Sequence, residues 1–159
     1  MDSSNRTFSV LLADDDPDDR FFAEKAFKDL GIPGSLKMVK NGEELLHYLD
    51  QCINCRDQQQ FIVPDFILLD LNMPEKNGWE ALDEIKIIRG LQDIPVIIWT
   101  TSDADEDRLR SIEMGADYFI TKPRDYSALL SSIHSLVRIF CGDYKRREVE
   151  IPDSTCHKY

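Results

Sequence analysis

The sequence has no apolar run approaching ~18 residues, the length that a membrane-spanning helix needs, so we expect no transmembrane segment. The stretch from Met1 to Thr7 is polar and lacks the apolar centre of a signal peptide. Basic residues are scarce too, since 19 Lys and Arg stand against 30 Asp and Glu, a formal net charge of −11. Non-specific binding to nucleic acid or to an anionic membrane needs clustered positive charge, which this balance argues against. We therefore expect a cytoplasmic protein that binds neither DNA nor membrane.

Cysteine is also sparse: the chain has four, at Cys52, Cys55, Cys141 and Cys156. Cys52 and Cys55 have the spacing of a redox motif or of half a zinc site. A complete zinc site needs about two more ligands, and Cys156 with His157 could supply them. Because the other constraints of a zinc site are missing, we favour reduced thiols in a surface loop.

The strongest pattern in the chain is an apolar run that ends in one carboxylate. Residues 66–69 are all apolar, Asp70 follows them, and Pro74 comes four residues later. The run has the length and bounds of a strand buried on both faces, although periodicity alone does not distinguish it from a buried helix segment. Because Pro74 disfavours helix at the residue before it, we expect a loop there. Asp70 should then lie at the carboxyl end of a central strand, where open α/β sheets bind ligands.

The rest of the chain alternates between strand-like runs and amphipathic helical stretches. We expect strands at residues 8–13, 36–40, 66–69, 96–99 and 118–120, each followed by a helix. Asp16 should cap the first helix, Pro17 should occupy its first turn, and Asn41 should cap the second. Such alternation predicts a parallel sheet with right-handed crossovers and helices on both faces.

Three helices and one loop have features of their own. In the first helix, Phe22, Ala26 and Leu30 form the expected buried stripe, and in the fifth the stripe is longer. The fourth helix carries few apolar residues, at Leu109, Ile112 and Met114, so it should pack loosely. Residues 52–63 show no period and are predicted to form a surface loop, longer than most connections of about 4–6 residues.

Polar side chains follow four of the predicted strands and should meet at one edge of the sheet. Asp14 and Asp15 follow the first strand, Asp70 the third, Thr100 the fourth and Lys122 the fifth. Three close carboxylates repel, which raises their pKa values unless a cation neutralises them. Mg²⁺ prefers oxygen ligands and bridges carboxylate and phosphate. With a lysine and a hydroxyl added, the set suits phosphoryl transfer onto an aspartate.

Over residues 8–140 the chain resembles a response-regulator receiver domain. The resemblance rests on five ordered motifs: Asp14-Asp15, the run from Leu69 to Gly78, Thr100-Thr101-Ser102, Gly115-Ala116-Asp117 and Lys122-Pro123. It implies a flavodoxin-like α/β fold, with a five-stranded parallel sheet of order 2-1-3-4-5 and helices on both faces. The receiver domain would be flanked by an N-terminal tail at residues 1–7 and a C-terminal tail at residues 141–159.

The resemblance also assigns roles in phosphoryl transfer and signalling. It implies that Asp70 is the phosphoacceptor, Thr100 the switch hydroxyl and Lys122 the phosphate-binding lysine. Phe119 falls at the position of the rotating aromatic side chain. The peptide bond between Lys122 and Pro123 would be cis. The residue after it, Arg124, departs from the apolar residue usual in the family.

The cofactor and partners are implied in the same way. Mg²⁺ would be held by Asp15, Asp70 and the backbone carbonyl of Asn72, with Asp14 assisting through water. The partner would be a sensor histidine kinase. The long loop at residues 52–63 and the acidic start are similar to single-domain regulators that serve bacterial phytochrome kinases. The signal would leave through a changed protein–protein surface, and a second copy of the chain is a candidate partner.

Three rival classes fit the sequence less well. A phosphatase of the haloacid-dehalogenase type would need a second Asp two residues after the nucleophile, where this chain has Asn72. A flavin-binding module would need a polar, glycine-rich phosphate loop after the first strand, where Asp14 and Asp15 would repel a phosphate. A transcription factor would need a DNA-binding domain after Phe140, where only one short basic cluster follows. We therefore expect a signalling domain rather than an enzyme that turns over outside substrates.

Overall fold

The computed structural model describes residues 7–55 and 60–142 of the chain. The two predicted tails lie almost entirely outside these ranges, as do the candidate zinc ligands Cys156 and His157. Within them, no helix is both long and apolar enough to cross a membrane.

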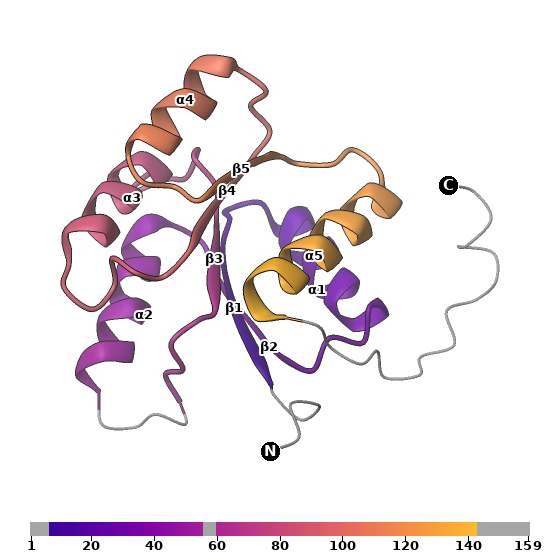
Figure 1. Cartoon of the computed structure of the whole chain (residues 1–159), viewed down its shortest axis with the longest axis horizontal. Coiled ribbons are helices and arrows are strands. Elements are labelled where there is room, and N and C mark those ends of the chain that lie inside the picture. Colours follow the sequence, from indigo (N-terminus) through magenta and orange to yellow (C-terminus); the bar gives the residue numbers. More distant parts are fainter. Residues whose placement is uncertain (1–6, 56–59, 143–159) are drawn as a thin grey trace.

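The sheet contains five parallel strands in the order β2-β1-β3-β4-β5, which confirms the predicted topology. Its strands are β1 (Phe8–Ala13), β2 (Gly34–Val39), β3 (Phe66–Leu69), β4 (Val96–Thr100) and β5 (Tyr118–Thr121). A helix follows each strand in turn: α1 (Pro17–Asp29), α2 (Gly42–Asn54), α3 (Gly78–Ile87), α4 (Asp105–Glu113) and α5 (Tyr126–Cys141). Figure 1 shows α2, α3 and α4 on one side of the sheet and α1 with α5 on the other.

Two hydrophobic cores fill the spaces between the sheet and its two helical layers. One lies under α2 and α3 and takes Leu11, Ile67 and Ile98 from the sheet. The other lies under α1 and α5 and takes the alternate residues, among them Leu12 and Leu68. Because side chains alternate across a strand, β1, β3 and β4 are buried on both faces, which explains their unbroken apolar runs.

The predicted helix caps are confirmed. The Asp16 carboxylate accepts hydrogen bonds from the backbone N–H groups of Asp18 and Asp19, and Pro17 begins α1. Asn41 caps α2 by accepting from the N–H of Glu44 at 2.8 Å. Each such cap contributes about 1 kcal/mol to helix stability. These caps begin both helices directly after the sheet edge that carries the acidic residues.

Two expectations, one about the end of α2 and one about the buried face of α1, are wrong. The first three residues of the predicted loop at 52–63 are helical, because α2 continues to Asn54. Cys52 extends the buried stripe of Leu45 and Leu49 by one turn and is itself buried. In α1 the predicted burial of Ala26 and Leu30 is confirmed, but Phe22 is 46% exposed and Ala23 is buried in its place.

The α4 helix packs as loosely as its sequence predicts, but its apolar side chains point outward. Leu109 is 62% exposed and Ile112 is 47% exposed. The buried residue of this helix is Ser111, whose hydroxyl donates to the carbonyl of Arg108. An apolar residue at position 111 would be needed for α4 to contribute strongly to the core.

The predicted cis bond between Lys122 and Pro123 is wrong. No cis peptide bond occurs in the described ranges, so this bond is trans. The trans form is also the intrinsically favoured one for a bond before proline, by about 0.5–1 kcal/mol.

Candidate functional site

Three candidate site residues continue the hydrogen-bond ladders of the sheet beyond the ends of their strands. The N–H of Asp14 donates to the carbonyl of Val39 at 3.0 Å, and that of Asp70 donates to Ala13 at 3.0 Å. The N–H of Lys122 donates to the carbonyl of Thr100 at 2.6 Å. The sheet backbone therefore fixes the positions from which these three side chains extend.

The acidic residues meet as predicted. Asp14, Asp15 and Asp70 each offer a carboxylate oxygen, and these oxygens lie within 4.8 Å of one another. Asp14 is fully buried and Asp70 nearly so, whereas Asp15 is exposed. The group therefore has a buried inner side and one side open to solvent.

Burial, more than mutual repulsion, sets the acidity of the two inner carboxyls. Loss of hydration raises the pKa of Asp14 to about 6, against the lowering effect of the nearby Lys122 ammonium. Burial likewise raises the pKa of Asp70, and Lys122 again opposes the shift. Repulsion from a neighbouring carboxylate adds to both shifts as the smallest of the causes. The sequence predicted the direction of these shifts but named the minor cause.

One oxygen of the group favours an added cation. Asp14 Oδ2 is buried and accepts no hydrogen bond from the described residues, although it is ion-paired with Lys122 Nζ at 2.7 Å. Carboxylate oxygens are the ligands that Mg²⁺ and similar hard divalent ions prefer. The three residues therefore fit a divalent metal ion on their own chemistry.

Lys122 contacts three carboxylates. Its Nζ lies 2.7 Å from Asp14 Oδ2, 2.7 Å from Asp19 Oδ2 and 3.2 Å from Asp70 Oδ2. Burial of this ammonium would lower its pKa, but the adjacent carboxylates of Asp14 and Asp19 outweigh burial and raise the pKa above its usual range. Lys122 is therefore firmly protonated at neutral pH.

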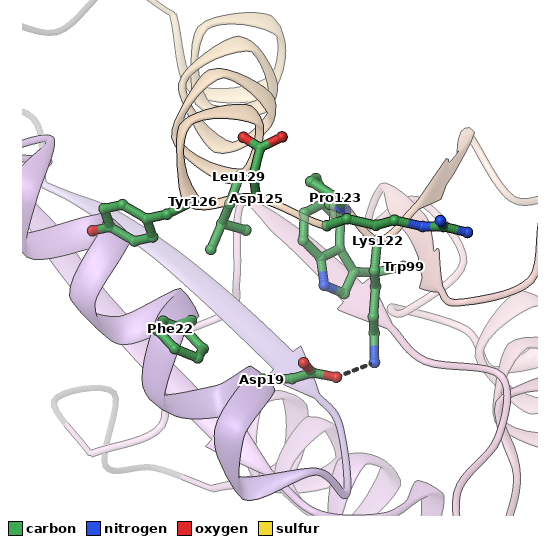
Figure 2. Close-up of a pocket in the computed structure, with 9 residues that line it drawn as sticks. Asp19, Phe22, Trp99, Lys122, Pro123, Asp125, Tyr126 and Leu129 are labelled. Carbon is green, nitrogen blue, oxygen red and sulfur yellow. Dashed lines mark hydrogen bonds and ion pairs between the residues drawn. The ribbon is translucent and has the colours of Figure 1, made fainter. Parts of the chain in front are cut away.

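Asp19 is the site residue that sequence reasoning missed. Its position in the first turn of α1 indicated only a favourable interaction with the helix dipole. The available signal was its place three residues after the cap Asp16, since one turn of helix returns the chain toward the strand end. Figure 2 shows the Asp19 carboxylate reaching the Lys122 ammonium from α1.

The predicted switch residues lie on the two neighbouring strands. Thr100 ends β4 and is fully buried, and its hydroxyl oxygen accepts from the N–H of Ser102 at 3.3 Å. Phe119 is buried under α4, with the Arg108 guanidinium 4.9 Å from its ring centre. Both therefore adjoin the loop and helix that follow β4.

The loop after β3 folds tightly back on Asp70. The N–H of Asn72 lies 3.4 Å from Asp70 Oδ1, and that of Gly78 donates to Leu71 at 2.9 Å. A Cβ on Gly78 would lie 2.2 Å from the carbonyl oxygen of Asp70, so this position requires glycine. The Asn72 side chain is exposed, and its predicted metal-binding carbonyl stays a prediction.

A cavity of about 280 Å³ adjoins the site on the α1 and α5 side. Asp19 and Lys122 lie at one end, and Trp99 also lines the cavity (Figure 2). The remaining lining residues are Phe22, Pro123, Arg124, Asp125, Tyr126 and Leu129. The polar contact between Asp19 and Lys122 is therefore reachable from the surface between the two helices.

The chain matches the family model described as the response regulator receiver domain, over residues 10–134. It is similar to response regulator Rcp1 of Synechocystis sp., with 31% identity over 135 residues that cover 85% of this chain and 90% of Rcp1. The structure of the phosphorylated cyanobacterial phytochrome response regulator RcpA has a TM-score of 0.75 and 29% identity, covering 86% of this chain and 95% of that one. The Mn²⁺-bound form of Rcp1 has a TM-score of 0.71 and 28% identity, covering 91% and 99%.

Proposed function

The chain belongs to the response regulator receiver family, and from this premise we propose that it is a stand-alone response regulator that accepts a phosphoryl group on Asp70. The observation that carries the proposal is the contact of Lys122 with the nearly buried Asp70, beside two further carboxylates. A carboxylate held against a lysine is a suitable phosphoryl acceptor, because phosphoryl transfer depends on positioning and on charge neutralisation.

In the proposed reaction, a carboxylate oxygen of Asp70 forms a bond to phosphorus while the bond between phosphorus and a donor histidine nitrogen breaks. The electron pair of that bond leaves with the histidine nitrogen. Asp70 thereby becomes a mixed anhydride, and its single negative charge is replaced by the larger charge of the phosphoryl group. Lys122 would contact a phosphoryl oxygen, and Thr100 would donate a hydrogen bond to another.

The proposed cofactor is Mg²⁺, held by Asp15, Asp70 and the backbone carbonyl of Asn72, with Asp14 behind them. When bound, Mg²⁺ would neutralise charge on the carboxylates and on the phosphoryl oxygens. The orphaned buried oxygen of Asp14 and the grouping of the three carboxylates support this choice. Asp14 and Asp15 would orient the site without reacting themselves.

The proposed partner is a sensor histidine kinase of the phytochrome type. RcpA is a phytochrome response regulator, and its likeness to this chain extends over 86% of the residues here. Rcp1, a response regulator, is matched over 90% of its own length. The output would then be a changed surface offered to a protein partner or to a second copy of the chain.

Phosphotransfer from purified histidine kinases tests the proposal. Histidine kinases of the phytochrome type and of other classes are first autophosphorylated with labelled ATP and then mixed with the wild-type chain or with Asp70→Asn. Label should pass to the wild type within the mixing time and fail to pass to Asp70→Asn. Equal labelling of both proteins would contradict Asp70 as the acceptor, and transfer only from other kinase classes would contradict the partner.

A further inference from the structure

Asp19 contacts the same ammonium as Asp14 and Asp70 but lies outside the group that can share a metal ion. Its carboxylate belongs to α1, is about one-third exposed, and lies 2.7 Å from Lys122 Nζ. Asp14 and Asp70 have a second task, since their oxygens also face the cation position. Among the three partners of Lys122, Asp19 is therefore the one whose contact serves the lysine alone.

The ammonium of Lys122 has three N–H groups, and three carboxylates surround it. The two shorter contacts, each of 2.7 Å, go to Asp14 and Asp19, and the contact to Asp70 is longer at 3.2 Å. The Lys122 side chain is only 10% exposed, and its Nζ lies within 3.2 Å of all three carboxylates. A phosphoryl oxygen on Asp70 must therefore take a proton of Lys122 that is already engaged.

We propose that Asp19 is a positioning residue that holds Lys122 in the resting state and weakens the binding of a phosphoryl group at Asp70. This rests on the proposed function. Asp19 competes with the phosphoryl oxygens for the ammonium, and its charge also repels them across a partly buried site. Both effects favour the unphosphorylated state.

Beryllofluoride, a phosphoryl analogue that binds to an aspartate carboxylate, measures this effect at equilibrium. Its dissociation constant is determined in saturating Mg²⁺ for the wild type, Asp19→Asn and Asp18→Asn. The control Asp18→Asn removes the same charge from the same helix turn, but Asp18 is exposed and its position has no part in the Lys122 contacts. We expect Asp19→Asn to bind about fivefold tighter than Asp18→Asn, the scale of one half-exposed ion pair.

Mg²⁺ affinity in the absence of beryllofluoride supplies the second readout. Asp19 is not in the metal group, so Asp19→Asn should bind Mg²⁺ no tighter than Asp18→Asn does. If Asp19→Asn binds both Mg²⁺ and beryllofluoride more tightly than Asp18→Asn does, the site has rearranged generally and the proposal is overturned. Beryllofluoride binding by Asp19→Asn that is no tighter than that of Asp18→Asn would overturn it too.

The failure of the proposed function gives a different result. If Asp70 is not a phosphoryl acceptor, the wild type itself shows no Mg²⁺-dependent beryllofluoride binding, and both proposals fall together. If the wild type binds beryllofluoride and the two Asn variants match each other, only the role of Asp19 is refuted. Thermal melts of both variants confirm that each compared protein is folded.

Discussion

Asp14 has the most unusual environment of any single residue at the site. It is fully buried, one of its oxygens lacks a hydrogen bond, and its pKa is raised to about 6. At neutral pH it is therefore ionised against the effect of its own burial, with Lys122 as its main compensation. A cation bound at this point would relieve that cost, which gives the metal site a measurable effect on stability.

The first prediction is that Mg²⁺ raises the melting temperature of the wild type. A ligand that binds only the folded state stabilises it by RT ln(1 + [L]/Kd), about 2.7 kcal/mol at 100 times Kd. Asp15→Asn, which neutralises the exposed carboxylate of the group, should lose most of this shift. Asp18→Asn is the control with the same change of charge, and it should keep the shift. A wild-type midpoint that stays constant up to saturating Mg²⁺ would contradict the metal site.

At this scale the sequence predicted the acidic group and Lys122, because each of these residues directly follows an apolar strand-like run. Asp19 could not be placed in the same way. Its hydrogen bond to Lys122 joins residues 103 positions apart and depends on the exact direction in which α1 leaves β1. Strand-end positions follow from topology, whereas this contact follows from the geometry of one helix turn.

Among the secondary-structure elements, α4 is the one with the weakest attachment to the core. It buries only Ser111 and holds its place through polar contacts. The Ser102 hydroxyl donates to Asp107 at 2.6 Å, and Arg108 donates to the carbonyl of Phe119 at 3.4 Å. Polar contacts near the surface rearrange at lower cost than a packed apolar face, so α4 is the element that a change at Thr100 can move.

The second prediction concerns the transmission of a change at Asp70 through Thr100 to α4. Beryllofluoride with Mg²⁺ should change amide hydrogen exchange in residues 100–122 and leave α1 and α2 nearly unchanged. We expect this because the segment from Thr100 to Lys122 would have two alternative conformations. The Thr100 hydroxyl and the buried Phe119 would shift the equilibrium between them, by a few kcal/mol at most. Thr100→Ala should bind the analogue and show a smaller change. A response of Thr100→Ala equal to that of the wild type would refute the route, as would a change confined to residues 60–63.

The helices on the opposite face are joined by an ionic cluster. The Tyr126 hydroxyl of α5 donates to the Asp29 carboxylate of α1 at 2.5 Å, and Lys25 pairs with Asp29 at 3.1 Å. Lys25 also lies 4.3 Å from the centre of the Tyr126 ring. The hydrogen bond from Tyr126 is the main cause that lowers the pKa of Asp29 below its usual value. The cluster thus links the two helices that form the walls of the cavity.

The third prediction is that Tyr126→Phe lowers the free energy of unfolding at neutral pH by about 1 kcal/mol, the worth of one exposed hydrogen bond to a charge. A depressed carboxyl pKa contributes stability above the unfolded pKa and loses it as pH falls through the folded one. The difference from wild type should therefore shrink below the usual pKa of Asp29, 3.8. Urea unfolding of both proteins, at neutral pH and at a pH below 3.8, measures the difference in free energy of unfolding. Tyr118→Phe, which loses an exposed hydroxyl of β5, is the control, and a deficit that persists unchanged at acid pH would contradict the assignment.

The order and type of the elements were predictable because hydrophobic period and capping residues agree along most of the chain. The errors occurred where tertiary packing decided between close alternatives. Cys52 continues the stripe of α2 because the helix has sheet to cover for one more turn. Phe22 faces outward because α1 is rotated so that Ala23 and Phe27 meet the sheet. The hydrophobic period of one helix does not determine this rotation about the helix axis.

At the scale of the whole molecule, the site is a product of the sheet topology. Asp70 directly follows the central strand β3, Asp14 follows the neighbouring β1 and Lys122 follows the edge strand β5, so only the folded sheet brings them together. The described residues bring a nearly buried carboxylate, a lysine ammonium and a group of three carboxylates into one cluster. The cytoplasmic location stays a prediction from the sequence, and the kinase and a second copy as partner stay predictions that rest on the family.

The central claim is that Asp70 accepts a phosphoryl group with the help of a divalent cation. The most direct measurement is the intact mass of the protein after incubation with acetyl phosphate, with Mg²⁺ or with excess EDTA. We predict one phosphoryl adduct on the wild type in Mg²⁺, almost none in EDTA, and none on Asp70→Asn under either condition. An adduct that persists on Asp70→Asn, or that forms equally well in EDTA, would contradict the account.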